Sequence, residues 1–344
     1  MPKYTVLAEI HKELDAKFAP FHGWHLPVNY PGGVLAEHKH VSRFCGISDS
    51  SQTGKIRVAG TGCAGELDKV LMYKVSSQEP GRSRQNYLLS GNGCFIADVS
   101  VFRMAEDDFF ITSGAGSTAA VLKHFTEKIS SDTVIQDLTE VIAKIDLLGP
   151  EAQNVLTEAE VDASLLPLPG CCGIVEIAGI RCIVNDPSGS IAGYELFCGA
   201  DNAIDLWDEL TCIEPVRPCG NSAKEILRVE RGLLGTEYNS TATPLDCGLE
   251  IPDYDFAGKA ALQNMKRSFS FVFVKLESKQ SVHAGDKVVL PSGEEAGVVT
   301  SSCVSSVSES ACAICKINSG TELKADDRVL VNGLPGTVCI PADR

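Results

Sequence analysis

The chain has 344 residues, of which 44% are hydrophobic, and a formal net charge of −15 at pH 7. This length exceeds one ordinary core and predicts roughly two or three domains. No window approaches the ~20 uninterrupted apolar residues of a membrane helix, and a nucleic-acid binder needs a clustered basic surface that so acidic a chain does not favour. We therefore expect a soluble protein with neither a membrane span nor a nucleic-acid partner.

The cysteines indicate a reducing compartment. The N-terminal stretch MPKYTVLAEIHKELDAKF lacks the apolar core of a signal peptide, so we expect a cytoplasmic location in which the 14 cysteines stay thiols. Only Cys312 and Cys315 have metal-like spacing, and no histidine lies near them in the sequence. Because ACAICKI alternates like a strand, we expect buried, packing cysteines and no metal site.

The first third of the chain begins with helical periodicity. Apolar residues spaced four apart predict an amphipathic helix over residues 5–18, with Val6, Ile10, Leu14 and Phe18 on one face. A second helix is expected to begin near Val34. Between them, FAPFHGWHLPVNYPGGV is too rich in glycine, proline and aromatic residues to be helical.

A period of two then predicts strands. The segment NYLLSGNGCFIADVSVFRMAEDDFFITSG contains three strand-like runs separated by short turns, which predicts antiparallel hairpins. A helix over residues 119–129 follows, then strands at TVIQDL and VIAKIDLLG. From residue 266 to 344 nearly every run alternates, with turns at Pro-Ser-Gly and Asn-Gly, which predicts an antiparallel barrel or sandwich.

The stretch FFITSGAGSTAAVLKHF (residues 109–125) has the glycine spacing of a dinucleotide-binding turn, and Asp137 follows where an acid would meet a ribose. A dinucleotide fold, however, begins its domain with that strand and connects parallel neighbours through helices. Here the strand is the return arm of a hairpin. Because GYELFCGADNAIDLWDEL repeats the strand, small-residue loop and helix, we predict a structural joint used twice.

Asp98 is the acid that the residues themselves single out. It lies in the apolar strand GNGCFIADVSVF, and on this evidence it either faces solvent at a sheet edge or lines a pocket. In a pocket, desolvation would raise its pKa and suit it to hydrogen bonding or proton exchange with a ligand amine.

A set of motifs in a fixed order resembles one known family. FAPFHGWHLPVNY followed by GGVLAEHKHV resembles the start of the aminomethyltransferase family, which includes the T-protein of the glycine cleavage system. Further along the chain come GISDSSQTGKIRVAG, GNGCFIADVSVFR, LLGPEA, AKEILRVERGLLGTEYNSTATPLDCGL and FAGKAAL. Each of these resembles the family's segment at the corresponding place, so the resemblance covers nearly the whole chain.

The resemblance implies an α+β fold. It implies antiparallel sheets with ferredoxin-like strand-strand-helix units around a central folate cavity, plus a C-terminal antiparallel β-barrel. The expected domains are a discontinuous folate-binding domain (residues 1–50 with 140–260), an inserted α+β domain carrying Asp98 (residues 51–139), and the barrel (residues 266–344).

The resemblance also implies a reaction. A tetrahydrofolate-dependent aminomethyltransferase moves a one-carbon unit from the aminomethyl-lipoyl arm of the H-protein to folate and releases ammonia. The folate nitrogens make the new bonds, so the protein supplies position and electrostatics. Tetrahydrofolate and the lipoylated H-protein are thus the expected co-substrate and partner.

Site residues follow position by position. Asp98 matches the family's catalytic aspartate, and Glu195 in GYELF matches its pterin-binding glutamate, whose two oxygens suit paired donors. Lys224 stands where the family has a folate-binding arginine, which keeps the charge but loses the planar fork. Phe102 keeps an aromatic ring at a third tyrosine position.

Several positions depart from the family. Ser188 and Gln85 replace tyrosines that pack on folate, and Ala97 replaces the first acid of an Asp-Asp pair. Losing such rings weakens pterin binding by ~1 kcal/mol or more per ring. Two alternatives therefore stay open: a folate-dependent demethylase of a small O-, N- or S-methyl compound, and a non-catalytic folate-binding relative.

Overall fold

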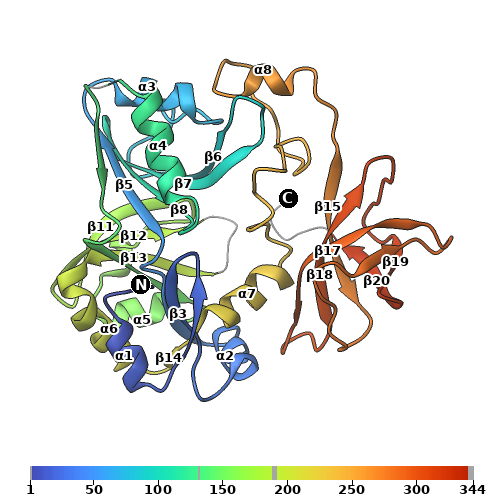
Figure 1. Ribbon diagram of the computed structural model, residues 1–344. Helices are drawn as coiled ribbons and strands as arrows, with labels where there is room; N and C mark the ends of the chain where they lie inside the picture. The colour runs from blue at the N-terminus through green and yellow to red at the C-terminus, as the bar shows by residue number, and fades with distance from the viewer. Residues whose placement is uncertain (1, 131, 188–191, 340–344) are drawn as a thin grey trace.

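Figure 1 shows the computed structural model of the protein, which describes residues 2–130, 132–187 and 192–339. Two sheets lie one above the other, and a barrel of C-terminal strands stands beside them. The helix α7 (Asn221–Glu230) and the chain after it run between the lower sheet and the barrel. None of the helices in the described ranges is long and apolar enough to cross a membrane.

A small sheet near the N-terminus has the order β1-β3-β2. Its elements and the helices beside it are β1 (Lys3–Tyr4), α1 (Ala8–Glu13), β2 (Lys17–Phe21), β3 (Trp24–Asn29) and α2 (Val34–Val41). The predicted start of the second helix at Val34 is confirmed. The helix predicted over residues 5–18 is confirmed only for Ala8–Glu13. It is wrong for residues 5–7 and beyond Glu13, where Asp15 takes a left-handed φ of 55° and Phe18 pairs with β3 in a hairpin.

The lower sheet has the strand order β11-β12-β13-β10-β4-β14. Its strands are β4 (Cys45–Asp49), β10 (Ile142–Leu148), β11 (Cys171–Ile177), β12 (Ile180–Asp186), β13 (Gly193–Gly199) and β14 (Val216–Pro218). Its helices are α5 (Ala152–Glu158), η1 (Ala163–Leu165), η2 (Ala200–Asn202) and α6 (Ala203–Thr211). One face packs on α5 and α6 around the buried Trp207, and the other face turns toward the upper sheet.

The upper sheet has the order β6-β7-β8-β5-β9. Its elements are β5 (Gly54–Ala59), α3 (Cys63–Val70), β6 (Ser83–Leu89), β7 (Phe95–Ala105), β8 (Asp108–Ser113), α4 (Thr118–Lys128) and β9 (Val134–Asp137). The predicted hairpins are confirmed, since β6, β7 and β8 pair in antiparallel succession. In β7 the residues Ala97, Val99 and Val101 enter the core under α3 and α4, so Asp98 and Phe102 lie on the opposite face.

The chain uses one arrangement twice. Both β5-α3-β6-β7-β8-α4-β9 and β10-α5-β11-β12-β13-α6-β14 run strand, helix, three strands, helix, strand. Their sheet orders correspond as well, except that β4 is inserted between β10 and β14. The sequence predicted the same strand, loop and helix in each copy, namely β8 followed by α4 and β13 followed by α6, and that prediction is confirmed.

The glycine-rich turn of residues 114–119 joins β8 to α4. Both neighbours of β8 are antiparallel to it, which contradicts a dinucleotide fold and agrees with the structural interpretation. Gly116 touches the N-terminal hairpin so closely that a Cβ there would lie 2.7 Å from Nδ1 of His22. Close packing therefore accounts for this glycine.

The C-terminal strands close into the predicted antiparallel barrel, in the order β15-β18-β17-β16-β19-β20. After α8 (Lys259–Leu262) come β15 (Phe269–Leu276), β16 (Lys287–Val289), β17 (Glu295–Val304), β18 (Ala311–Asn318), β19 (Arg328–Val331) and β20 (Leu334–Cys339). Cys312 and Cys315 are buried in β18, as predicted, and they pack in different clusters on its two faces. A spacing of three along a strand cannot bring two thiols to one metal ion.

The predicted α+β class is thus confirmed, with antiparallel sheets and a C-terminal barrel. Two short pairs depart from it, because β1 with β3 and β4 with β14 are parallel. Residues 54–137 supply the upper sheet, whereas residues 45–49 and 142–218 supply the lower one. The division of the chain into folding domains stays a prediction.

An aromatic cluster joins the two sheets. Phe102 and Phe110 of the upper sheet meet Phe197 of the lower sheet edge to face, with ring centroids 5.1–5.6 Å apart. All three side chains are at most 4% exposed. Such edge-to-face pairs add to the burial of the rings themselves, so this cluster fixes how the sheets sit on each other.

Truncating Phe197 tests that contact. We expect Phe197→Ala to lower the free energy of unfolding by about 3–5 kcal/mol, because it opens a cavity between the sheets. A shift of the urea midpoint measures this effect. Leu168→Ala is the control, since Leu168 is 73% exposed and its loss should change stability by less than about 0.5 kcal/mol; equal shifts in both variants would contradict the assignment.

Candidate functional site

Asp98 lies on the face of β7 that turns away from the hydrophobic core of the upper sheet. Its side chain is partly buried, and within the described part of the chain no side chain donates a hydrogen bond to it or forms an ion pair with it. Burial therefore raises the pKa of Asp98 to about 6. A carboxylate held without a partner is ready to accept a ligand's donor or positive charge.

An aromatic cluster begins beside this acid. Tyr87 of β6 lies directly opposite Asp98 in the strand register. The Tyr87 ring lies 5.4 Å from Phe95 and 5.3 Å from Tyr238, and its hydroxyl lies 3.5 Å from that of Tyr238. Because Tyr238 belongs to the chain after α7, this cluster brings that segment against the upper sheet beside Asp98.

Glu195 lies on β13, on the lower-sheet face that turns toward the upper sheet. One carboxylate oxygen accepts a hydrogen bond from Nζ of Lys144 at 2.6 Å, and the other accepts one from Nδ2 of Asn185 at 2.7 Å. Each residue comes from a strand next to β13, so the sheet itself orients the carboxylate. A carboxylate has about four acceptor positions, so the bonds that Glu195 accepts from side chains of the described residues leave one position on each oxygen.

Lys224 on α7 reaches the same face of the sheet. Its Nζ donates to Oδ2 of Asp146 at 2.5 Å and to the hydroxyl of Ser50, which itself donates to Asp146 at 2.6 Å. Asp146 also lies 3.2 Å from Lys144. We call Lys224, Asp146, Lys144, Glu195 and Asn185 the buried ion network.

The charges of the buried ion network stabilise each other. Burial opposes ionisation of Asp146, but the positive charges of Lys144 and Lys224 hold the pKa of this carboxyl well below its usual range. Burial likewise opposes the charge on Lys144, and Asp146 and Glu195 outweigh it and raise the pKa of the ammonium. Both groups are thus charged at neutral pH.

Lys144 and Asp146 were missed in the sequence analysis. The signal is present in VIAKIDLLG, where two opposite charges alternate with Ala143, Ile145 and Leu147. Because alternate residues of a strand share a face, this pattern indicates a charged pair on one face of a buried strand. The partner elements, α7 and β13, are not visible in it.

Lys55 was also missed, because the groups that contact it in the folded chain are not visible in the sequence pattern. It is fully buried on β5, and its Nζ donates to the carbonyl oxygen of Ser51 at 2.7 Å. Burial lowers the pKa of Lys55 to about 7, with Asp49 opposing this effect and Lys144 adding to it. The amine is therefore partly neutral near physiological pH.

The structure thus places the predicted residues in two groups. Glu195 and Lys224 are joined through Lys144 and Asp146, whereas Asp98 lies on the facing sheet. Phe102, on the same face of β7 as Asp98, contacts Phe197, and Phe197 shares a face of β13 with Glu195. The two acids therefore lie on the facing surfaces of the two sheets, on strands that meet at this aromatic contact.

The remaining predicted positions have different outcomes. Phe102 is fully buried in the aromatic cluster, and a direct contact of its ring with folate stays a prediction that this burial does not favour. Gln85 is exposed on β6, opposite Ser100. Ser188 lies outside the described residues. Among the residues that are described, no group of His, Cys, Asp and Glu side chains has the arrangement of a metal site.

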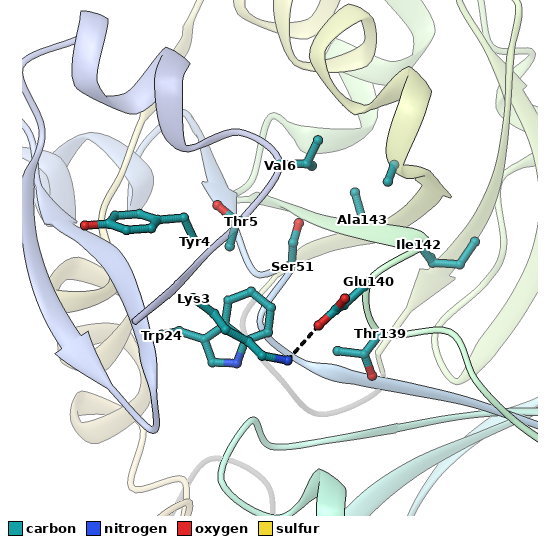
Figure 2. A pocket seen from close by; sticks show the side chains of 11 residues that line it. Lys3, Tyr4, Thr5, Val6, Trp24, Ser51, Thr139, Glu140, Ile142 and Ala143 are labelled. Carbon is teal, nitrogen blue, oxygen red and sulfur yellow. Dashed lines mark hydrogen bonds and ion pairs between the residues drawn. The ribbon is translucent and has the colours of Figure 1, made fainter. Parts of the chain in front are cut away.

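A separate pocket lies where the chain crosses between the two sheets. Figure 2 shows this cavity of about 350 Å³, with Trp24 at one wall and the Lys3–Glu140 ion pair, 2.6 Å long, at its mouth. Asp98, Glu195 and Lys224 do not line it. We therefore do not assign the predicted folate residues to this pocket.

Removing the ammonium of Lys144 tests the buried ion network. We expect Lys144→Met to lower the free energy of unfolding by about 3–5 kcal/mol at pH 7, because it leaves the buried carboxylates short of a cation. Urea denaturation measures this loss. Because the pKa of Asp146 is lowered in the folded state, its contribution is complete above about pH 4 and is lost as pH falls further, so the difference between wild type and variant should shrink in acid.

Lys279→Met is the matched control for Lys144→Met. Lys279 forms an ion pair of similar length with Glu309, but its side chain is 65% exposed. Exposed pairs contribute about 0–1 kcal/mol, so this variant should stay close to wild type. A loss for Lys144→Met no larger than that of Lys279→Met would contradict a stabilising role for the network.

Comparison with known proteins agrees with this fold. Residues 7–252 match the family model of the GCVT N-terminal domain. The aminomethyltransferase of Streptomyces avermitilis is 31% identical, covering 87% of this chain and 85% of that protein, and the aminomethyltransferase of Geobacillus thermodenitrificans is 29% identical, covering 87% and 86%.

A solved structure resembles the whole chain. The crystal structure of glycine cleavage system aminomethyltransferase T from Bartonella henselae matches with a TM-score of 0.90 and 25% identity, covering 100% of this chain and 98% of that one. The two sheets and the C-terminal barrel described above therefore occur together in a solved structure. The chain belongs to the aminomethyltransferase family, and its residues 7–252 match the GCVT N-terminal domain.

Proposed function

We propose that the protein is a tetrahydrofolate-dependent aminomethyltransferase of glycine cleavage. In this reaction the one-carbon unit passes from the aminomethyl-lipoyl arm of the H-protein to folate, and ammonia is released. Relatives that carry the name aminomethyltransferase align over most of their length with this chain. The observation that carries the proposal is Asp98, a carboxylate beside an aromatic cluster and without a side-chain partner among the described residues, at the position that the sequence resemblance assigns to the family's catalytic acid.

Asp98 is the residue that we place at the reacting atoms. Its carboxyl is ionised above about pH 6. Positive charge develops on the folate nitrogen as it captures the one-carbon unit and ammonia leaves, and a fixed negative charge in a site of low dielectric stabilises it. The rings of Tyr87, Phe95 and Tyr238 keep water away from the carboxylate and so strengthen this effect.

Glu195 is the residue that we expect to orient the pterin. The folate fits this acid because Lys144 and Asn185 use only one acceptor position on each oxygen, which leaves room for two parallel donors. Lys144 also keeps the carboxylate in one orientation. Lys224 contributes through Asp146, since its ammonium is already bound there, and a direct contact of Lys224 with folate stays a prediction.

Neutralising Asp98 is the main test. We expect Asp98→Asn to lower the rate of one-carbon transfer by roughly 10²-fold or more, because the amide carries no charge to stabilise the transition state. The wild-type rate should rise with pH through a midpoint near 6, as Asp98 loses its proton, and this rise should be absent in the variant. Formation of methylene-folate measures both.

Ser100→Ala is the control for Asp98→Asn, because Ser100 lies two positions further along the same face of β7. It should keep the wild-type rate. Calorimetry on the same preparations should show folate binding to wild type and to both variants. Wild-type protein that binds no folate would sink the proposal, and an unchanged rate in Asp98→Asn would favour a non-catalytic folate-binding relative.

The choice of donor separates the proposal from a demethylase. The binding of Lys224 to Asp146, together with the exposed Gln85 in place of a tyrosine, favours the demethylase as the second candidate. We expect ammonia release and methylene-folate only in the presence of the aminomethylated H-protein. Methyl-folate formed from a small methyl compound without the H-protein would support the demethylase instead. A cytoplasmic location stays a prediction in either case.

A further inference from the structure

Two cysteines face each other across neighbouring strands of the barrel. Cys303 of β17 lies directly opposite Cys312 of β18 in the antiparallel register, and both are free thiols. Cys312 is 2% exposed and packs in the hydrophobic cluster that joins barrel residues such as Phe271 to upper-sheet residues such as Phe95. Cys303 is partly exposed and packs against the same cluster. The pair lies outside the proposed folate site.

The register makes this pair suited to a disulfide. Directly opposite residues of an antiparallel pair have Cα atoms ~4.5–5.5 Å apart, which falls within the ~4.4–6.8 Å that disulfides span. Cys315 is excluded, because it lies opposite Val299 and packs inside the barrel. Strand geometry thus selects Cys312 as the partner of Cys303.

The two thiols also interact before oxidation. The neighbouring thiol of Cys303 lowers the pKa of Cys312, and Cys312 raises that of Cys303. Glu230 opposes the thiolate on Cys312, while Lys275 favours it. In contrast, burial alone raises the pKa of Cys315 to about 12. Since the thiolate is the reactive form, Cys312 is the better nucleophile of the hairpin.

We propose that Cys303 and Cys312 form an oxidation site, at which a hydroperoxide closes an intrachain disulfide between β17 and β18. One sulfur attacks the peroxide and takes one of its oxygens to become a sulfenic acid, and the other oxygen leaves as water, or as an alcohol if the hydroperoxide is organic. The second thiol then attacks that sulfur, which forms the S–S bond and releases the hydroxyl oxygen as water. In total, two thiols are oxidised and one hydroperoxide is reduced.

The disulfide would change how α7 contacts the barrel. The thiol of Cys303 donates to the carbonyl oxygen of Ile226 at 3.8 Å, and a disulfide has no hydrogen to donate. Arg228, on the same helix, binds the hydroxyl of Ser301 at 2.9 Å, two residues before Cys303. Oxidation therefore acts at the junction of the barrel with the helix that carries Lys224.

Peptide mapping of the full-length chain tests the proposal. The protein is treated with hydrogen peroxide, remaining thiols are alkylated, and the chain is cleaved after glutamate without reduction. Cleavage after Glu295, Glu309 and Glu322 gives peptide 296–309, which holds Cys303, and peptide 310–322, which holds both Cys312 and Cys315, so fragmentation of the joined peptides must locate the linked cysteine. We expect these peptides to be joined, to lose their alkylation at Cys303 and Cys312, and to separate on reduction.

Other cysteines of the chain provide the controls. The link should be lost in Cys303→Ser and in Cys312→Ser but kept in Cys315→Ser. Cys212 is exposed and reports that the peroxide has acted. Cys182 and Cys198 lie on adjoining strands one position beyond the paired Ile183 and Phe197, but both are 1% exposed, whereas Cys303 is partly exposed to peroxide, so Cys182 and Cys198 should stay reduced.

Two results would overturn the proposal. The first is recovery of unlinked peptides with alkylated Cys303 and Cys312 at a peroxide dose that oxidises Cys212. The second is a link through Cys315. Because mass spectrometry of the wild-type chain reads out the bond directly, neither result depends on folate binding or on transfer activity.

Discussion

The pairing of Lys144 with Asp146 and Glu195 is the interaction on which the lower sheet and the proposed site both depend. A buried ammonium is costly unless its charge is balanced and its protons are bound. Lys144 meets both conditions through contacts of 3.2 and 2.6 Å. It lies on β10, between β13 and β4, so the middle of the sheet carries the charge that orients Glu195.

The same network extends to the barrel. Asp146 binds Lys224 of α7, and Arg228 of that helix binds Glu237 and the barrel residue Ser301. Asp246 then accepts hydrogen bonds from the backbone of Ser268 and Phe269, where the first barrel strand begins. Charged groups therefore hold together parts of the chain that share no sheet, and α7 carries two of them, Lys224 and Arg228.

The repeated arrangement of strands explains why the acids face each other. Each copy covers one face of its sheet with its own helices, so the uncovered faces turn inward and meet at Phe102, Phe110 and Phe197. One copy carries Asp98 on its inward face and the other carries Glu195. The aromatic cluster excludes water at the contact, whereas the polar residues nearby keep their hydrogen bonds, as buried polar groups must.

The sequence by itself determined the local elements. Alternation located the hairpins and the barrel strands, because side chains on one face of a strand recur every second residue. It also indicated the strand-to-helix joint that occurs twice, and its resemblance to a family selected Asp98 and Glu195 as site residues. It was wrong for residues 5–7 and 14–18, which are not helical, and from residue 17 pairing with β3 overrides the helical pattern.

The tertiary structure alone decided which faces meet. Alternation shows that Lys144 and Asp146 share a face, but it does not show that β13 and α7 supply their partners. In the same way it could not show that Phe102 is buried against Phe197 or that Cys303 lies opposite Cys312. The physical reason is that a sequence pattern records the polarity of each surface, whereas ion pairs and packing depend on which distant segment covers it.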